Sequence, residues 1–334
     1  MRAVVLVGGF GTRLRPLTLS VPKPMLPVGH VPIIERLVVN LVRGGVTNVT
    51  LALGFKPDAF LRAFPDGVCG GATLRYAVEP EPLDTAGAIR FAADEAGIED
   101  TFVVANGDVL TDLDIGSLVA FHDSRRAEAT LHVIGVDDPS AFGVVALDAD
   151  CRVEHFVEKP VPGTEPSNLI NAGTYVLEPS VLDRIPLGER CSIERVTFPA
   201  VADEGRLFAL ASDDYWIDTG TPELYLQANL DVGAGLRPHD RCEAVSRGAS
   251  IDPSAHVADS VVAAGATVGE AARVERSVLL DGAHVGSGAS VVDSVVMGHV
   301  ATGASVDRSV LGADAVVESG EVVVGVKRPD PAVT

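Results

Sequence analysis

Residues 1–16 read MRAVVLVGGFGTRLRP, and the order of residue types in this stretch predicts how the fold begins. The apolar run Ala3–Val7 stops at Gly8 and Gly9, and Thr12–Arg15 follow. This pattern predicts a buried strand that ends in a glycine-rich turn. Such turns present successive backbone N–H groups, which commonly hold a phosphate. The chain is therefore expected to open with a strand and a phosphate-binding turn.

Two common phosphate motifs do not fit this turn. A dinucleotide-binding fingerprint needs a third glycine at position 14, but Leu14 stands there and Pro16 prevents an immediate helix. A Walker loop needs Gly-Lys followed by Ser or Thr, and that sequence is absent here. What remains is Arg13, whose planar guanidinium suits bidentate phosphate contacts, and Lys23, which stands between two prolines.

Short apolar runs alternate with helical patterns from this turn to about residue 230. The predicted strands are Ala3–Val7, Asn48–Leu53, Thr73–Val78 and Thr101–Ala105. The predicted helices are Ile33–Val42, Asp58–Phe64 and a third that Asp84 can cap and that runs to about Ala96. Continuous apolar strands between helices predict an α/β fold, a Rossmann-like and mainly parallel sheet with helices on both faces. Ligands of such sheets bind beyond the carboxyl ends of the strands, where the Gly8–Arg13 turn and Asp108 fall.

The rhythm changes between about residues 128 and 218, where strands follow one another with less helix between them. The predicted strands are Ala129–Val136, Gly143–Leu147, Val153–Val157, Thr174–Leu177 and Arg206–Ala211. We expect them to extend the first sheet in antiparallel fashion, so that the whole sheet is mixed.

A different repeat begins at residue 249. Ile, Val or Leu recurs every five or six residues, and a longer unit is repeated at Ser260, Ser277, Ser294 and Ser309, spaced 17, 17 and 15 residues apart. Three short faces of about six residues make one coil, so each unit predicts one coil of a β-helix with stacked aliphatic side chains inside. The pattern resembles the hexapeptide-repeat left-handed β-helix.

Composition limits the possible partners and location. The chain has 334 residues, 47% of them hydrophobic, and a formal net charge of −20, which argues against a nucleic-acid partner. The apolar start is too short for a signal peptide, and no apolar stretch reaches the roughly 20 residues of a spanning helix. The four cysteines form no CxxC pair. We therefore expect a soluble, cytoplasmic protein without a membrane partner.

The motif Gly-Gly-x-Gly-Thr-Arg-Leu-x-Pro, followed by Pro-Lys-Pro at Lys23, resembles the signature of the sugar-1-phosphate nucleotidyltransferases. The resemblance is close over residues 1–230. It implies a catalytic domain at 1–232, a linker at 233–248, the β-helix at 249–326 and a tail at 327–334. It also implies that the turn binds the nucleotide through Leu6, Gly8, Gly9, Gly11, Thr12, Arg13 and Lys23.

Two aspartates are of interest, one after the predicted strand Thr101–Ala105 and one in a separate motif. Asp108 closes Asn106-Gly107-Asp108, and Asp218 lies in Trp216-Ile217-Asp218-Thr219-Gly220-Thr221. In the family that the chain resembles, a Trp-x-Asp-x-Gly-Thr segment provides a metal ligand. The resemblance therefore implies a Mg²⁺ site at Asp108 and Asp218, with Asn106 near the nucleotide. Magnesium favours carboxylate and phosphate oxygens.

The sugar phosphate is assigned to Glu158-Lys159-Pro160. In the similar enzymes the glutamate binds sugar hydroxyls and the lysine binds the phosphate. A carboxylate is a suitable acceptor for vicinal hydroxyls, and an ammonium is a compact partner for phosphate. Gly143 and Asn171 also match segments that line the sugar pocket.

The base is assigned to the segment from Glu79 to Gly87. Guanine presents two adjacent N–H donors, which a carboxylate can accept, whereas similar thymidylyltransferases carry Gln where Glu79 stands. Asp84 replaces a glycine that relatives with guanylyl specificity carry. Either that position needs a positive φ or a close approach, or Asp84 caps the following helix.

The implied reaction condenses a sugar 1-phosphate with an NTP to give an NDP-sugar and pyrophosphate. Mannose 1-phosphate and GTP are the expected substrates, with glucose-1-phosphate thymidylyl or uridylyl transfer and heptose-1-phosphate guanylyl transfer as alternatives. Arg13, Lys23, Asp108, Lys159 and Asp218 are the expected catalytic residues. We also expect a homo-oligomer formed through the β-helix or the catalytic domain.

Two functions of other classes remain open. One is a bifunctional enzyme whose β-helix is an acyltransferase. His256, His284 and His299 are available for this activity, although no long loop is inserted to build an acyl-donor site. Alternatively, the chain is a non-catalytic regulatory subunit, although the five expected catalytic residues are all present.

Overall fold

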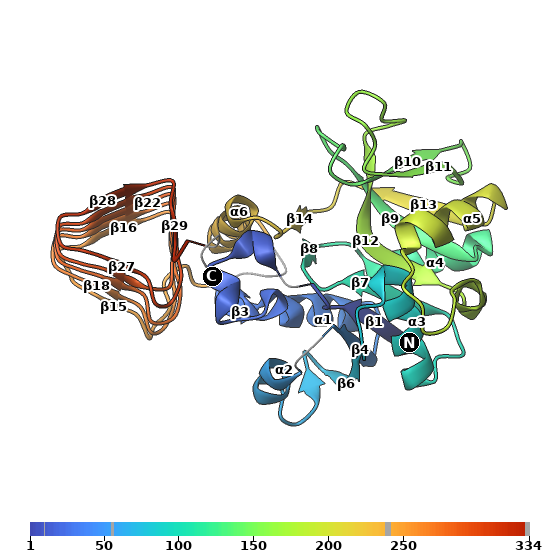
Figure 1. Cartoon of the computed structure of the whole chain (residues 1–334), viewed down its shortest axis with the longest axis horizontal. Helices are drawn as coiled ribbons and strands as arrows, with labels where there is room; N and C mark the ends of the chain where they lie inside the picture. Colours follow the sequence, from blue (N-terminus) through green and yellow to red (C-terminus); the bar gives the residue numbers. More distant parts are fainter. Residues whose placement is uncertain (10, 55–56, 238–241, 331–334) are drawn as a thin grey trace. The chain divides into compact units, whose positions relative to one another are not determined.

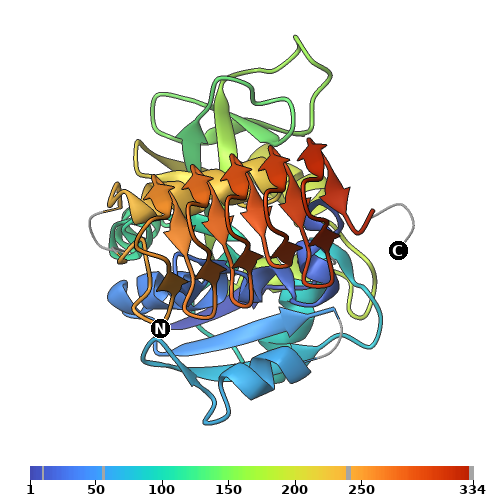
Figure 2. The same ribbon diagram turned by 90° about the vertical axis from the view of Figure 1, so that its left-hand side faces the viewer.

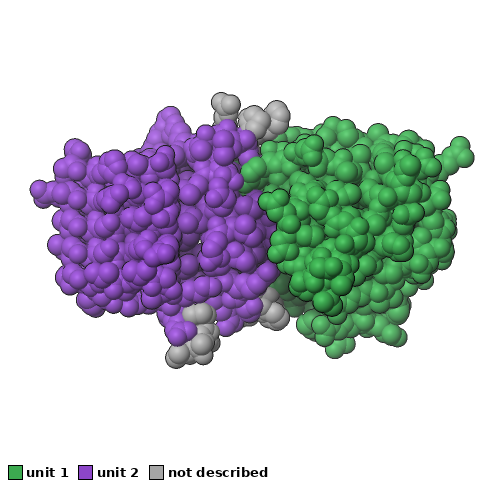
Figure 3. Space-filling view, turned by 90° about the horizontal axis from the view of Figure 1, so that it is seen from above, with its two compact units in different colours: residues 1–9, 34–216 green, residues 10–33, 217–334 purple. Residues whose placement is uncertain are grey.

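The computed structural model describes residues 1–9, 11–54, 57–237 and 242–330. The chain divides into two units, which are coloured separately in Figure 3. Unit 1 comprises residues 1–9 and 34–216, and unit 2 comprises residues 10–33 and 217–334. The phosphate-binding turn therefore starts in unit 1 and continues in the unit that holds the β-helix. Part of the expected linker, 238–241, and the end of the expected tail, 331–334, lie outside the described residues.

Four parallel strands form the centre of unit 1 (Figure 1). Their order across the sheet is β7 (Phe102–Asn106), β1 (Arg2–Leu6), β4 (Asn48–Leu53) and β6 (Ala72–Val78). The consecutive residues Ala3, Val4 and Val5 have no exposed surface, although neighbouring side chains of a strand point to opposite faces. Both faces of this sheet are therefore covered, as the continuous apolar runs predict.

An antiparallel extension follows, as predicted. The strand β12 (Leu169–Leu177) pairs antiparallel with β7, with β9 (Ala129–Gly135) and with β10 (Gly143–Leu147), which in turn pairs with β11 (Val153–Glu158). One strand departs from the expectation, because β13 (Leu207–Ser212) pairs with β9 in parallel. In the sheet, β9 lies between β12 and β13. It runs antiparallel to β12 and in the same direction as β13.

The helices of unit 1 pack against this mixed sheet. They are α2 (Asp58–Ala63), α3 (Asp84–Ala96), α4 (Ile115–Arg125), α5 (Phe198–Asp203) and most of α1 (Ile33–Arg43). α3 packs on β1, β4 and β6, α4 packs on β9, β12 and β13, and α5 packs on β11 and β13. The short strands β5 (Val68–Cys69) and β8 (Val109–Thr111) and the turns η4 (Pro179–Arg184) and η5 (Ile193–Thr197) complete the unit. No helix in the described part of the chain has the length and apolar character that crossing a membrane requires.

Asp84 does not cap α3, so that interpretation is wrong. The N-cap residue is Leu83. The Asp84 carboxylate accepts the N–H of the adjacent Thr85 at 2.9 Å and lies 3.6 Å from Nε of Arg190. Asp84 has φ +62°, in the left-handed region that favours glycine. A glycine would adopt this backbone conformation without the strain that an aspartate has there.

Unit 2 contains the β-helix that the repeat predicts, built from three parallel sheets of five strands each (Figure 2). The first sheet is β15 (Ser250–Ile251), β18 (Thr267–Val268), β21 (His284–Val285), β24 (His299–Val300) and β27 (Val316–Val317). The second is β16 (His256–Ala258), β19 (Arg273–Glu275), β22 (Ser290–Val292), β25 (Ser305–Asp307) and β28 (Val322–Val324). The third is β17 (Val261–Val262), β20 (Val278–Leu279), β23 (Val295–Val296), β26 (Val310–Leu311) and β29 (Lys327–Arg328).

The register of the sheets explains the 15-residue interval in the serine spacing. Val278 is paired with Val295, and Val295 is paired with Val310, so the coil that starts at Val295 is shorter than the one before it. The shortened corner contains Gly298, where an added Cβ would lie 2.3 Å from the carbonyl oxygen of Ala315. Only glycine fits this tight corner.

The β-helix extends further than the sequence pattern indicates. Lys327 and Arg328, which we assigned to a tail, form β29 and pair in parallel with Val310 and Leu311. The prediction ended too early because these two residues lack the aliphatic character of the earlier coils, and backbone pairing continues without it.

A ladder of serines runs along one corner of the β-helix. Ser277 is fully buried, and its Oγ donates to the carbonyl of Glu275 at 2.7 Å and accepts the N–H of Ser294 at 3.1 Å. The same two bonds recur at the other serines of the repeat, Ser260, Ser294 and Ser309. Each serine of the repeat thus places its hydroxyl next to a backbone N–H group of the following coil.

Replacing Ser277 by alanine is expected to lower the free energy of unfolding by about 1–3 kcal/mol, because the buried N–H of Ser294 loses its acceptor. Urea titrations followed by circular dichroism would measure the change. Ser287 is exposed in the same β-helix, and Ser287→Ala, the matched control, is expected to change stability by less than about 0.5 kcal/mol. Equal effects of the two substitutions would contradict the role of the ladder.

Candidate active site

The carboxyl ends of the parallel strands in unit 1 bring part of the expected nucleotide site together. Leu6 ends β1, half-buried, and its carbonyl accepts the N–H of Gly107 at 2.8 Å, just beyond β7. An added Cβ on Gly107 would lie 2.5 Å from a methyl carbon of Val7, so only glycine permits this approach. Asn106 and Asp108 flank Gly107 and are half-buried. The turn after β7 is therefore packed directly against the end of β1.

Gly8 and Glu79 are neighbours at the carboxyl ends of these strands. A Cβ placed on Gly8 would lie 3.4 Å from the backbone nitrogen of Gly54 and 3.6 Å from Oε1 of Glu79. Gly9 is exposed, and apart from its chain neighbours no atom of the described residues lies within 4 Å of its Cβ position. Gly9 therefore leaves space beside the backbone of this turn.

Glu79 is 7% exposed and follows β6 directly. Its Oε2 accepts the N–H of Leu83 at 2.9 Å, which closes the segment that we assign to the base. Burial raises the pKa of the Glu79 carboxyl, and the bond from Leu83 opposes this shift. Gly87, also assigned to the nucleotide, has a packing role, since an added Cβ would lie 2.7 Å from the carbonyl oxygen of Glu189.

The residues assigned to the sugar phosphate converge on the antiparallel part of the sheet. Gly143 is paired with Glu158 across β10 and β11, and an added Cβ on Gly143 would lie 2.9 Å from Oε2 of Glu158. The ammonium of Lys159 lies 3.7 Å from Oε1 of Glu158, and the Lys159 side chain is 61% exposed. Lys159 has φ +49°, a strained conformation for lysine.

Burial raises the pKa of Glu158, and the negative charge of Glu194 raises it further, while Lys159 and Arg195 lower it. Glu194 lies in the π-helical turn η5, and its Oε2 accepts hydrogen bonds from Thr85 at 2.6 Å and Ser192 at 2.8 Å. Sequence reasoning missed Glu194. A Ser-x-Glu pattern is common at the start of any helix, so only the fold reveals that this carboxylate acts on Glu158.

Asn171 is fixed by two hydrogen bonds within unit 1. Its Nδ2 donates to the hydroxyl of Tyr175 at 3.0 Å, and its Oδ1 accepts the N–H of Gly173 at 3.0 Å. The indole N–H of Trp216 donates to the carbonyl of Ala172 at 2.9 Å. The rings of Trp216 and Phe142 meet edge to face, with centroids 5.7 Å apart. A rigid aromatic pair therefore stands beside the strand that carries Asn171.

Unit 2 brings together the other three expected catalytic residues. Asp218 ends β14 (Trp216–Asp218), and its Oδ1 lies 3.5 Å from the ammonium of Lys23, whose side chain is only 8% exposed. An added Cβ on Gly220 would lie 2.7 Å from Nη2 of Arg13 and 2.9 Å from Oδ1 of Asp218. The Arg13 guanidinium and the Asp218 carboxylate thus lie against a glycine that leaves no room for a side chain, and Lys23 lies beside the same carboxylate.

The turn that carries Arg13 is ordered by its own residues. Gly11 has φ +60°, and its carbonyl accepts the hydroxyl of Thr18 at 2.8 Å. Thr12 opens the 3₁₀ turn η1 (Thr12–Leu14) and is exposed together with Arg13, whereas Leu14 is fully buried. The burial of Leu14 anchors the turn and leaves Arg13 on the surface, where a ligand can reach it.

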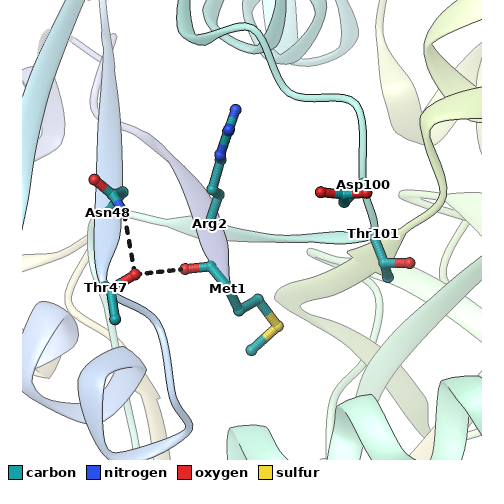
Figure 4. A pocket seen from close by; sticks show the side chains of 6 residues that line it. All are labelled: Met1, Arg2, Thr47, Asn48, Asp100 and Thr101. Carbon is teal, nitrogen blue, oxygen red and sulfur yellow. Dashed lines mark hydrogen bonds between the residues drawn. The ribbon is translucent and has the colours of Figure 1, made fainter.

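A cavity of about 270 Å³ lies at the amino ends of the strands of unit 1, opposite their carboxyl ends (Figure 4). It is lined by residues at the amino ends of the strands and in the adjoining loops: Met1, Arg2, Thr47, Asn48, Asp100 and Thr101. None of them is an expected site residue. Ligands of parallel sheets bind at the carboxyl ends, so this cavity is not the candidate active site.

Comparison with families of known proteins identifies both parts of the chain. Residues 2–235 match the family model described as nucleotidyl transferase, and residues 244–330 match the model described as GlmU-like, C-terminal hexapeptide.

Individual relatives lead in the same direction. The mannose-1-phosphate guanylyltransferase of Mycobacterium tuberculosis is 43% identical over 76% of this chain and 72% of its own length. The probable mannose-1-phosphate guanylyltransferase 1 of Oryza sativa subsp. japonica is 41% identical over 78% and 71% of the two chains. The mannose-1-phosphate guanyltransferase of Aspergillus fumigatus is 39% identical over 77% and 73%.

A solved structure agrees with these relatives. The crystal structure of HddC from Yersinia pseudotuberculosis superposes with a TM-score of 0.59 at 31% identity, covering 68% of this chain and 97% of that one. The same protein has been crystallised in complex with GMP-PN. The first family model spans more than half of the chain, and the Mycobacterium relative exceeds 30% identity over most of both sequences. The chain therefore belongs to the nucleotidyl transferase family, as its glycine-rich turn and Lys23 led us to expect.

Proposed function

We propose that the protein transfers the guanylyl group of GTP to mannose 1-phosphate, giving GDP-mannose and pyrophosphate. The observation that carries this proposal is the run of relatives named mannose-1-phosphate guanylyltransferase, at 39–43% identity over about three quarters of the chain. The buried carboxylate of Glu79 beside Gly8 supports the choice of guanine.

The reaction forms one bond and breaks one. A phosphate oxygen of mannose 1-phosphate attacks the α-phosphorus of GTP, and the bond from that phosphorus to the bridging oxygen breaks, leaving its electron pair on pyrophosphate. Two polyanions must meet, so positioning and charge neutralisation matter more than proton transfer. We assign Arg13 to the departing pyrophosphate, Lys23 to the reacting phosphates and Lys159 to the attacking phosphate.

A divalent cation is expected in this family, and we propose Mg²⁺ with Asp108 and Asp218 as its carboxylate ligands. Asp218 fits this role, since its side chain is 23% exposed and carries an oxygen that already faces a cation. Among the described residues, no cluster of three or more His, Cys, Asp or Glu side chains could hold a metal. A pair of carboxylates suits Mg²⁺, which keeps waters and phosphate oxygens as its other ligands and neutralises phosphate charge.

Turnover assays would test the proposal with GTP, dTTP, UTP and ATP, each combined with mannose 1-phosphate and glucose 1-phosphate, with and without Mg²⁺. The expected result is the highest kcat/KM for GTP with mannose 1-phosphate. The highest efficiency with dTTP and glucose 1-phosphate would overturn the choice of base and sugar. Inactivity with every pair would favour a regulatory subunit.

The raised pKa of Glu158 predicts how the KM for the sugar phosphate depends on pH. Glu158 can accept two hydroxyl hydrogen bonds only when ionised, and burial together with Glu194 raises its pKa above that of an exposed glutamate. Ionisation is therefore lost at a higher pH than the usual value near 4.3. The KM for the sugar phosphate is expected to rise as the pH falls from 8 to 5.

The sugar phosphate itself titrates near pH 6, so the Glu158→Gln variant serves as the reference. The difference between the two pH profiles isolates Glu158, because the variant retains the titration of the substrate. Parallel profiles of the wild type and Glu158→Gln would contradict the assignment.

We also propose that the protein acts in the cytoplasm as a homo-oligomer, with contacts through the β-helix or the catalytic domain. The exposed valines Val316, Val322 and Val324 on the β-helix support this proposal. Light scattering of the purified full chain would test it, and a monomer at micromolar concentration would overturn it.

A further inference from the structure

The final coil of the β-helix contacts the turn that carries Arg13. The ammonium of Lys327, in β29, donates to the carbonyl oxygen of Arg13 at 3.2 Å. These two residues are 314 positions apart in the chain but belong to the same unit. Lys327 is one of only four lysines in the sequence.

A second contact lies next to the first. An added Cβ on Gly312 would lie 3.0 Å from Cβ and 3.3 Å from Cγ of Pro16, and 3.4 Å from the Pro16 carbonyl oxygen. Gly312 and Pro16 are both buried. The turn therefore rests on the β-helix through a close backbone approach as well as through a hydrogen bond.

The strand that carries Lys327 is itself held firmly. Lys327 in β29 is paired with Val310 in the neighbouring strand β26. The guanidinium of the neighbouring Arg328 donates to both carboxylate oxygens of Glu321, at 2.7 and 3.2 Å, and to the carbonyl of Val316 at 2.7 Å. These contacts hold the backbone of β29 in place, and the side chain of Lys327 extends from it.

Residues 27–29, farther along segment 10–33, are held by α6 (Pro222–Gly233). The hydroxyl of Tyr225 donates to the carbonyl of Pro27, and the side chain of Asn229 accepts the N–H of Gly29 at 2.9 Å. α6 packs on β17 and β20 of the β-helix. The segment that carries Arg13 and Lys23 is thus supported by α6 and by the last coil of the β-helix.

We propose that Lys327 is a positioning residue for Arg13, through which the last coil of the β-helix sets the conformation of the nucleotide-binding turn. The inference rests on the proposed function, because it assigns the effect to Arg13 and the pyrophosphate end of the nucleotide. A cation on the Arg13 carbonyl restrains the backbone between Thr12 and Arg15, and that restraint directs the guanidinium toward the phosphate. The β-helix is then part of the catalytic apparatus as well as a means of assembly.

The test compares Lys327→Met, which removes the donor but keeps most of the volume, with Lys327→Arg, which keeps a cationic donor. Loss of one such exposed hydrogen bond is expected to raise the KM for GTP about five- to tenfold and to weaken pyrophosphate binding similarly. The KM for mannose 1-phosphate is expected to stay within about twofold of the wild-type value, and Lys327→Arg is expected to recover at least half of the loss.

Gly312→Ala acts on the second contact, and its added methyl group is expected to raise the KM for GTP as well. The matched control is Arg273→Met, because Arg273 is another exposed cation of the β-helix whose guanidinium pairs with Glu275. It is expected to leave both KM values unchanged. Thermal unfolding midpoints of all variants separate a local effect on the turn from a loss of folding.

Calorimetric titration with pyrophosphate and Mg²⁺ gives a readout that does not need turnover. Wild-type values of the KM for GTP and of pyrophosphate affinity in both Lys327→Met and Gly312→Ala would overturn the inference, as would equal increases in both KM values. A wild-type enzyme that turns over no substrate pair would overturn the proposed function alone, and the pyrophosphate titrations would still decide the role of Lys327.

Discussion

Replacing Lys23 by methionine is expected to lower kcat/KM for GTP by a factor of about 10²–10³, while the protein stays folded. The Lys23 ammonium is almost fully buried and lies 3.5 Å from the Asp218 carboxylate. That carboxylate and the Arg13 guanidinium both lie beside Gly220. A preorganised cation in a site with little water stabilises developing phosphate charge far more than one in solvent. Methionine fills most of the same volume without charge, so the chemistry is expected to suffer more than the packing.

Steady-state kinetics with GTP and mannose 1-phosphate would measure this loss, and circular dichroism would check the fold. Arg62 is an exposed cation of α2, and Arg62→Met, the matched control, is expected to retain full activity. A Lys23→Met variant within tenfold of the wild type would show that Lys23 does not act on the reacting phosphates.

Much of the fold follows from local periodicity in the sequence. The boundaries of β4 and β10 are predicted to the residue, because short apolar strands leave a clear pattern in the sequence. The β-helix is equally legible, since each coil repeats the same arrangement of aliphatic and small residues. Local patterns do not predict a strand that is formed by backbone pairing alone, as at Lys327 and Arg328. They also do not predict an unusual backbone conformation imposed by tertiary packing, as at Asp84.

The candidate site is only partly accessible from sequence. Lys23 and Asp218 are 195 residues apart, and the family motifs assign each of them to the active site without placing one beside the other. The structure of unit 2 brings them within 3.5 Å of each other. Glu194 and Lys327 left no such signal, because one acts through a neighbouring carboxylate and the other through a backbone carbonyl. The roles of all these residues in catalysis stay predictions until variants are measured.

Base selectivity offers the second large effect, through Glu79→Gln. One carboxylate oxygen of Glu79 accepts the N–H of Leu83, and the amide oxygen of glutamine can keep that bond. The other oxygen would be replaced by an NH₂ group, which faces the N–H donors of guanine with a donor of its own. Buried N–H donors that lose their acceptor cost about 1–3 kcal/mol. We therefore expect kcat/KM for GTP to fall about a hundredfold, while the values for dTTP and UTP stay the same or rise.

The matched control for this substitution stands two residues away. Glu81 is exposed in the same loop, and Glu81→Gln changes the net charge identically without touching Leu83 or Gly8. It is expected to leave the ratio of kcat/KM for GTP to that for dTTP unchanged, because a solvated charge at that distance contributes little to selectivity. If Glu79→Gln and Glu81→Gln shift that ratio equally, the effect is one of net charge and Glu79 does not read the base. If only Glu79→Gln shifts it, the carboxylate after β6 is the group that selects guanine.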